Sequence, residues 1–431
     1  MIDPISEQLP THEERMRWFH EARFGMMIHW GLYSLLGQGT WAMHHGRIPH
    51  REYARLADEF KPKKYDPAAW AELAAECGMK YMVLTTRHHD GFCMYDSRVS
   101  DFTSVKCAAK RDFVAEYAEA CRRAGLRVGF YYSLLDWRFP GFFEREKYPE
   151  SARAMVQQAH GQLRELLTNY GRIDMIWFDG HWFAEKPGAW RWENPQPIID
   201  FWRMHELDAT IRSLQPHIIF NDRTGLPGDY FTAEQEVSAI SRPFREWEAA
   251  QTIGDYWESW CCQRFMPNPS RKSVFQLIIQ LMLCAAGNGN FMLNVGPTPD
   301  GVIPKEDEKR YRGIGEWLKV NGEAIYGTYA VYWPVMCAVA QITAKGNSAY
   351  LMMPNWPKDE VIVSGVGAAP VSAYFLRTGE RLKIDYRPDG RLFVRGLPKK
   401  PPDKYATVIK LEFERPIEPK HSADSAQWVQ G

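Results

Sequence analysis

Short apolar runs alternate with longer amphipathic stretches from about residue 20 to residue 330 of this 431-residue chain, and this alternation constrains the fold most. Each apolar run is nearly continuous, as expected of parallel strands that are covered on both faces. The predicted strands span residues 25–30, 81–86, 128–132, 175–178, 218–221 and 291–295. The predicted helices between them span residues 67–77, 111–124, 151–170, 197–215 and 273–286. Repeated strand–helix units predict an α/β fold with a parallel sheet, and this many units favour a (β/α)8-type, TIM-like barrel.

The predicted barrel is irregular in one stretch. Residues 221–273 carry no clear helical pattern, so we expect long loops there in place of one or more barrel helices. After about residue 330 the pattern changes to short strand-like runs at residues 349–353, 360–363, 372–376, 391–394 and 407–411. Turn signals such as Pro388-Asp389-Gly390 separate these runs. We therefore predict a catalytic barrel over residues 1–334, a small antiparallel β-sandwich domain over residues 335–416 and a polar tail over residues 417–431.

The charge balance and the hydropathy pattern argue against two classes of partner. Lys+Arg and Asp+Glu both number 53, so the chain lacks the basic field that nucleic-acid binding normally needs. No apolar run reaches the roughly 18 residues that a membrane span requires. The 17 Trp residues fit a large aromatic core or a ligand that stacks on aromatic rings. We expect no nucleic-acid partner, no membrane partner and a neutral substrate.

The cysteines and the first residues bear on the cellular location. The eight cysteines include no CxxC pair, and most lie in apolar runs, where a reduced and buried thiol is the usual state. Residues 1–16 contain four acidic side chains and no apolar segment typical of a secretory signal. These features predict a cytoplasmic protein. The sequence leaves the oligomeric state open, a homo-oligomer included.

Polar and aromatic side chains gather where the predicted strands end. In a (β/α)8 barrel, these C-terminal strand ends form the face that carries the reactive groups. The side chains found there are His29, Trp30, Arg87, His88, His89, Asp90, Tyr131, Tyr132, Trp177, Asp179, Asn221, Asp222 and Arg223. No glycine-rich phosphate loop accompanies them, and the combination is typical of a sugar pocket. The His88-His89-Asp90 run resembles a metal site, but adjacent strand residues point to opposite faces, which argues against one shared ion.

Asp179 is the most informative carboxylate. It follows a wholly apolar strand and precedes Gly180, so it is expected at the barrel mouth between hydrophobic walls. A role as a helix N-cap is disfavoured because residues 180–183 do not begin a convincing helix. A glycosidase needs a second carboxyl group, which protonates the leaving oxygen. The spacing alone does not rank the four candidates, which are Glu234, Glu236, Glu246 and Glu248.

A series of motifs carries a family resemblance. The motifs are Trp18-Phe19 and the segments 24–31, 85–92, 111–112, 129–133, 136–139, 177–180, 221–223 and 289–297. In this order they resemble the α-L-fucosidases of glycoside hydrolase family twenty-nine, over roughly residues 17–334 and more weakly to about residue 415. A chance match to the whole series is not credible.

The resemblance implies a retaining exo-α-L-fucosidase that acts on a fucosylated oligosaccharide or glycoconjugate and needs no metal or organic cofactor. It assigns the nucleophile to Asp179. It assigns the acid/base to Glu234, which lies 11 residues after Arg223, with Glu236 as the second choice and Glu248 expected to be structural or merely near the pocket. The residues that it implies for substrate binding are His29, Trp41, His88, His89, Tyr131, Trp177 and Arg223.

One position departs from the family pattern. Many members have a glutamate immediately before the tryptophan that corresponds to Trp41, whereas this chain has Thr40. This departure concerns one edge of the sugar pocket and therefore the selectivity for fucose. Two alternative functions are an exo-glycosidase for a related sugar such as α-L-galactose and a non-catalytic fucose-binding barrel.

Overall fold

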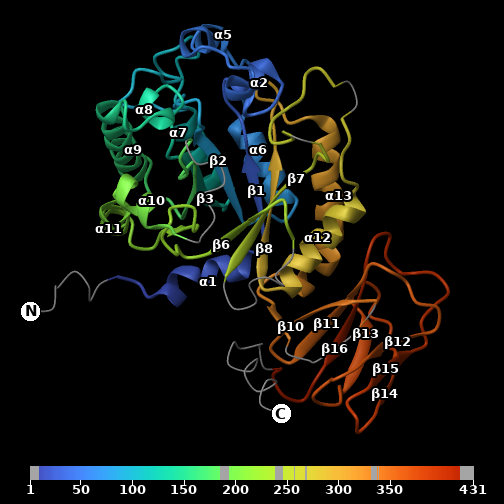
Figure 1. Ribbon diagram of the computed structural model, residues 1–431. Helices are drawn as coiled ribbons and strands as arrows, with labels where there is room; N and C mark the ends of the chain where they lie inside the picture. Colours follow the sequence, from blue (N-terminus) through green and yellow to red (C-terminus); the bar gives the residue numbers. More distant parts are fainter. Residues whose placement is uncertain are drawn as a thin grey trace, which may run out of the picture.

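The computed structural model describes residues 9–184, 194–237, 246–256, 258–266, 269–331, 337 and 339–417. Figure 1 shows an α/β part that contains the N-terminal three quarters of the chain and a separate group of β-strands near the C-terminus. Apart from residue 417, the predicted polar tail lies outside the described residues. Within the described residues, no helix is both long and apolar enough to cross a membrane.

Eight strands form one curled parallel sheet in the α/β part. They are β1 (Phe24–Ile28), β2 (Tyr81–Arg87), β3 (Arg127–Ser133), β4 (Met175–Asp179), β5 (Ile219–Phe220), β6 (Phe231–Glu234), β7 (Trp247–Thr252) and β8 (Gly289–Val295). Their order is β5-β4-β3-β2-β1-β8-β7-β6. The two edge strands meet through a single parallel bridge between Asn221 and Tyr230. The predicted (β/α)8-type barrel is confirmed, with a weak closure between β5 and β6.

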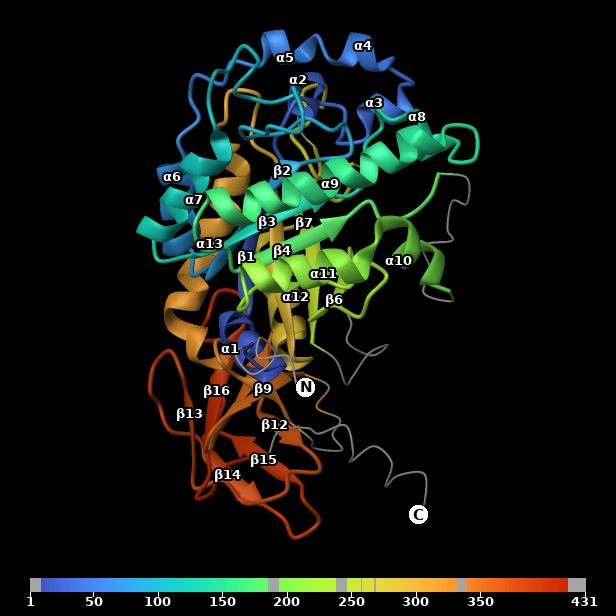
Figure 2. The ribbon, with the colours of Figure 1, turned by 90° about the vertical axis from the view of Figure 1, so that its left-hand side faces the viewer.

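Helices surround the sheet (Figures 1 and 2). The longer ones are α1 (His12–Ala22), α6 (Pro67–Glu76), α7 (Phe113–Arg123), α9 (Pro149–Asn169), α10 (Gln196–Trp202), α11 (Met204–Leu214), α12 (Val274–Ala286) and α13 (Lys305–Asn321). Short helices α2 (Tyr33–Leu36), α3 (Ala42–His45), α4 (His50–Tyr53), α5 (Leu56–Glu59) and α8 (Pro140–Phe143) lie on the connections. In the described part of residues 221–273 no helix forms, as expected from the missing pattern.

Local sequence explains where these helices begin and where one of them breaks. Asp66 accepts a hydrogen bond from the backbone N–H of Ala69 at the start of α6. Ser273 and Gln276 form a capping box at the start of α12. The predicted helix 197–215 is divided into α10 and α11, because Arg203 between them adopts a left-handed backbone with φ 54°.

The N-terminal end of the barrel is closed by α1 (Figure 1). Phe19 of α1 stacks on Tyr230 with ring centroids 4.8 Å apart. Met16 and Phe19 join a buried cluster inside the barrel that also contains Tyr81 and Trp177. This end is therefore packed, and polar groups with access to solvent gather at the opposite end.

Two antiparallel sheets form the C-terminal part. The five-stranded sheet has the order β13-β16-β11-β10-β9, and the three-stranded sheet has the order β12-β15-β14. The strands are β9 (Tyr329–Ala330), β10 (Gln341–Lys345), β11 (Ser348–Met353), β12 (Glu360–Val363), β13 (Ser372–Phe375), β14 (Lys383–Tyr386), β15 (Leu392–Arg395) and β16 (Thr407–Glu412). The sheets share a hydrophobic core that includes Leu351, Val363 and Phe375. The predicted β-sandwich is thus confirmed, and its larger sheet begins at Tyr329.

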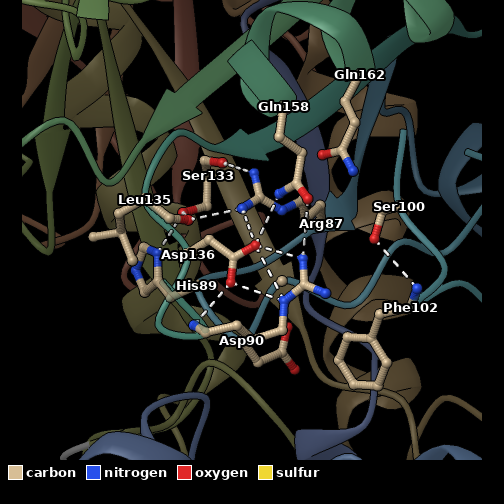
Figure 3. Close-up of polar contacts among 12 residues, drawn as sticks. Arg87, His89, Asp90, Ser100, Phe102, Ser133, Leu135, Asp136, Gln158 and Gln162 are labelled. Carbon is tan, nitrogen blue, oxygen red and sulfur yellow. Dashed lines mark hydrogen bonds and ion pairs between the residues drawn. The ribbon is translucent and has the colours of Figure 1, made fainter. Parts of the chain in front are cut away.

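A buried ionic network fixes the loop that follows β3 (Figure 3). Asp136 forms ion pairs with Arg87 at 2.8 Å and with Arg138 at 2.6 Å, and Asp136 and Arg87 are fully buried. Burial alone would raise the pKa of Asp136, but the guanidinium groups of Arg138 and Arg87 hold it well below its ordinary value. Arg87 also donates to the carbonyl oxygens of Ser133 and Leu135. This network sets the path of the chain immediately beside the end of β4.

Replacing Asp136 by Asn is expected to destabilise the protein by about 3–5 kcal/mol, because it leaves two arginines without a buried counter-charge. The measurement is the free energy of unfolding in urea. Asp101→Asn is the matched control, since Asp101 pairs with Lys106 at 2.7 Å but its side chain is 99% exposed. Equal stabilities of the two variants would contradict this role of Asp136.

Candidate active site

Asp179 is the last residue of β4 and lies at the open end of the barrel. Its side chain is 12% exposed. The next residue, Gly180, has φ 70°, and a Cβ atom there would lie 2.6 Å from the Ser133 Oγ and 2.8 Å from the Leu135 side chain. The chain therefore requires glycine to turn sharply after Asp179.

Three side chains surround the Asp179 carboxylate. Arg223 donates from Nη1 to Oδ1 at 2.9 Å, and the Tyr131 hydroxyl donates to Oδ2 at 2.8 Å. His89 Nε2 lies 3.6 Å from the same Oδ2 atom. Burial favours the protonated form of Asp179, but the charge of Arg223 and these hydrogen bonds outweigh it and lower the pKa. The carboxylate is therefore ionised at neutral pH.

Glu234 is the last residue of β6, and its side chain is 36% exposed. Arg223 donates from Nη2 to the Glu234 Oε2 atom at 2.5 Å while its Nη1 holds Asp179. One guanidinium group thus joins the two carboxylates that the sequence analysis selects. One of them is nearly buried and the other is open to solvent.

The other three candidate acids occupy different environments. Glu246 lies near α1, within 3.4 Å of His12 and 3.6 Å of His20. Glu248 is fully buried inside the barrel, where it bonds to Tyr81 and Trp177. Glu236 is exposed, and no contact among the described residues joins its side chain to Arg223. Of the four candidates, the described contacts bring only Glu234 to the arginine that holds Asp179.

The aromatic residues implied for substrate binding form one contiguous group beside Asp179. The Tyr131 ring stacks on the rings of Trp177 and His88, with centroids 5.4 and 5.5 Å apart. His29 packs edge-on against Tyr131 at 5.3 Å. The predicted residues from β1, β2, β3 and β4 therefore meet at one place.

Trp41 lies at the edge of this group, before α3. Its ring packs edge-on against His89 at 5.2 Å and lies parallel to Trp182 at 6.0 Å. Trp137 also contacts His89, at 5.2 Å. His89 is fully buried beneath these indole rings, and its Nε2 atom faces the Asp179 carboxylate.

The histidines of the site are neutral. Burial lowers the pKa of His29 to about 4 and lowers the pKa values of His88 and His89 well below their ordinary range. A neutral imidazole has one donor and one acceptor nitrogen, which suits recognition of hydroxyl groups. His88 Nδ1 and His89 Nε2 are buried and make no hydrogen bond within the described part of the chain.

The local hydrogen bonds identify the tautomer of His89. The Ser133 hydroxyl donates to the carbonyl of Leu135 at 3.0 Å, so it accepts from His89 Nδ1 at 2.7 Å. The Nε2 atom is then an acceptor that faces a second acceptor, the Asp179 carboxylate. Two acceptors that face each other need a donor between them, and a hydroxyl group can supply it.

Residues that the sequence analysis did not identify complete the site. Asn294 accepts from His29 Nδ1 at 2.7 Å and donates to the Trp260 carbonyl at 2.6 Å. The carboxylate of Glu258 accepts from the Thr40 hydroxyl at 3.1 Å and from the Trp41 backbone at 3.3 Å. A glutamate from a distant loop therefore lies beside the position where Thr40 departs from the family pattern. No local sequence signal links residues 217 positions apart.

Among the described residues, no group of three or more His, Cys, Asp or Glu side chains is arranged to hold a metal ion. The site instead combines two carboxylates, one arginine, neutral imidazoles and aromatic rings. Carboxylates, imidazoles and aromatic faces together match the hydroxyls and apolar patches of a sugar.

Comparisons with known proteins agree with this chemistry. The family model for alpha-L-fucosidase matches residues 4–323. The tissue alpha-L-fucosidase of Homo sapiens is 31% identical over 91% of this chain and 88% of its own length. The solved alpha-L-fucosidase isoenzyme 1 from Paenibacillus thiaminolyticus is 32% identical, with a TM-score of 0.82 over 94% of this chain and 99% of that chain.

A second solved structure extends the match to the family level. The GH29 alpha-L-fucosidase of Bacteroides thetaiotaomicron is 26% identical, with a TM-score of 0.83 over 94% of this chain and 96% of that chain. Another structure of an enzyme from that organism is described as a trapped covalent intermediate formed with 2-fluoro-fucosyl fluoride. The chain described here therefore belongs to the α-L-fucosidases of glycoside hydrolase family twenty-nine and is a glycoside hydrolase.

Proposed function

We propose that this glycosidase is a retaining exo-α-L-fucosidase in which Asp179 is the nucleophile and Glu234 is the acid/base. The observation that carries the proposal is the bridging of these two carboxylates by the Arg223 guanidinium, at 2.9 and 2.5 Å. A retaining enzyme needs two carboxyl groups that act on the same anomeric carbon, one as an attacking group and one as a proton donor. The Bacteroides thetaiotaomicron structure trapped as a covalent intermediate supports the same mechanism for a relative.

In the first step, a carboxylate oxygen of Asp179 forms a bond to the anomeric carbon while the bond from that carbon to the leaving oxygen breaks. The leaving oxygen receives the electron pair and takes the proton of Glu234. Tyr131 and Arg223 orient the attacking carboxylate through their hydrogen bonds. The result is a fucosyl ester on Asp179 and an ionised Glu234 beside a positive Arg223.

In the second step, Glu234 takes a proton from a water molecule as the water oxygen attacks the anomeric carbon. The ester bond breaks, and its electron pair returns to Asp179 as a carboxylate. The two inversions give net retention of configuration. The exposed position of Glu234 suits this step because the aglycone leaves toward solvent and water enters from the same side.

The sugar hydroxyls would be recognised by the unpaired nitrogens of His88 and His89 and by the acceptor nitrogen of His29. A non-catalytic binding barrel is less well supported, because both carboxylates are present and share one arginine. An enzyme for α-L-galactose would use the same acids, and hydrolysis of a panel of aryl glycosides separates it from a fucosidase.

The variant Asp179→Ala should lose at least roughly 10⁴-fold of kcat on an aryl α-L-fucoside, because no other group forms the ester. Initial rates and the thermal midpoint of the variant test this. Asp200→Asn on the exposed face of α10 is the control and keeps full activity. Substantial turnover by the folded Asp179→Ala protein would exclude Asp179 as the nucleophile.

The variant Glu234→Ala should lose about 10²–10⁴-fold of its activity on substrates with poor leaving groups and much less on activated ones, because only the former need protonation. Added azide should restore turnover by attacking the fucosyl ester without base assistance. The matched control is Glu236→Ala, which removes an acid two positions away. Azide rescue of Glu236→Ala instead would move the acid/base to that residue.

A further inference from the structure

Glu248 is a buried carboxyl group that the proposed mechanism does not use. It lies on β7 and points into the barrel, where it is fully buried. Its Oε2 atom is 2.5 Å from the Tyr81 hydroxyl, and its Oε1 atom accepts from the indole nitrogen of Trp177 at 3.2 Å. No ion pair of the described residues involves Glu248.

The surroundings of Glu248 disfavour a negative charge. The titratable groups that face it are Tyr81 on β2, Tyr230 next to β6 and Cys284 on α12, and all three are neutral at pH 7. The nearby Arg23 donates to the carbonyls of Gly289 and Thr328 instead. Burial raises the pKa of Glu248 to about 8, and the bonds from Tyr81 and Trp177 only partly oppose this. An unpaired buried carboxylate is costly, so the neutral acid is the stable form.

A neighbouring orphan acceptor fits the same protonation state. The Asn290 side chain interacts with the Tyr81 hydroxyl, and its amide nitrogen donates to the Phe19 carbonyl at 2.9 Å. Its Oδ1 atom is buried without a partner in the described part of the chain. If Glu248 donates its proton to Tyr81, the tyrosine proton becomes free for this oxygen.

Glu248 is connected to the nucleophile through Trp177. The Trp177 ring stacks on Tyr131 at 5.4 Å, and the Arg223 guanidinium lies 4.9 Å from its centroid. Tyr131 and Arg223 are the two residues that donate to the two oxygens of Asp179. Trp177 precedes Asp179 by two residues on the same strand, so both side chains point into the barrel.

We propose that Glu248 is a positioning residue that acts as a neutral carboxylic acid: it fixes the Trp177 ring and thereby holds Tyr131 and Arg223 in place against Asp179. The inference rests on the proposed role of Asp179. A carboxylic acid can donate to Tyr81 and accept from Trp177 at once, whereas an aliphatic side chain can do neither.

The test compares Glu248→Gln with Glu248→Leu on an aryl α-L-fucoside. Glutamine reproduces the donor and the acceptor of the neutral acid, so kcat should stay close to that of the wild type. Leucine removes both bonds, and kcat should fall roughly 10²-fold with little change in KM, because the nucleophile is misplaced. If Glu248→Leu does not fold, Trp177→Phe removes the same indole bond and should give the same loss. A Glu248→Gln enzyme as impaired as these variants overturns the proposal.

The pH dependence of the thermal midpoint provides a readout that does not depend on the catalytic mechanism. A folded pKa near 8, above the ordinary value of 4.5, means that the wild type loses stability as the pH rises from about 4.5 to 8. Glu248→Gln cannot ionise at this position. The thermal midpoint of Glu248→Gln minus that of the wild type should therefore increase as the pH rises across this window and stay constant above pH 8. A constant difference between the two proteins would show that Glu248 is ionised in the fold and would overturn the proposal. An active Asp179→Ala enzyme would overturn the mechanism while leaving this readout intact.

Discussion

The active site depends on one guanidinium group placed between two carboxylates. Arg223 is nearly buried and donates from separate nitrogens to Asp179 and to Glu234. The planar fork of an arginine fixes both distance and direction, which a lysine could not do. The Arg223 guanidinium also packs on the face of the Trp177 ring. Its position is therefore set by this ring as well as by the two carboxylates. The carboxylates of Asp179 and Glu234 and the Trp177 ring therefore share one anchor.

Much of the fold was predictable because most strands are buried on both faces by apolar side chains. Strands β1 to β5 and β8 match predicted apolar runs, whereas β6 and β7 do not. In these two strands, polar residues such as Thr232, Glu248 and Gln251 are buried and point toward partners from other strands. A local sequence pattern reveals apolar residues but not tertiary hydrogen bonds. The sequences of β6 and β7 were therefore interpreted as acidic loops. The two strands that escape prediction are thus strands whose apolar pattern is interrupted by buried polar side chains.

The grouping of the candidate site residues was predictable to a similar extent and for a related reason. Asp179 stands out because a carboxylate directly after an apolar strand has few structural explanations. Glu234 does not stand out by spacing, because its relation to Asp179 exists only through Arg223. Trp260 and Glu258 had no signal at all, and Asn294 was covered only as part of the motif over residues 289–297, since each acts through contacts with residues far away in the chain. Family resemblance supplied the ranking of the acids that the residue pattern lacked.

The weak closure between β5 and β6 has a mechanical consequence. The strands on either side of it carry the two carboxylates: Asp179 ends β4, next to β5, and Glu234 ends β6. The edges are joined by one bridge and by side-chain bonds such as Asn221 to Thr232 at 3.2 Å and Asp229 to the backbone of Phe220 at 3.0 Å. Bending the barrel wall here disrupts fewer bonds than bending it elsewhere. The softest deformation of the wall is thus the one that changes the distance between the carboxylates of Asp179 and Glu234, while the longer ladders that join β1, β2, β3 and β4 stay intact.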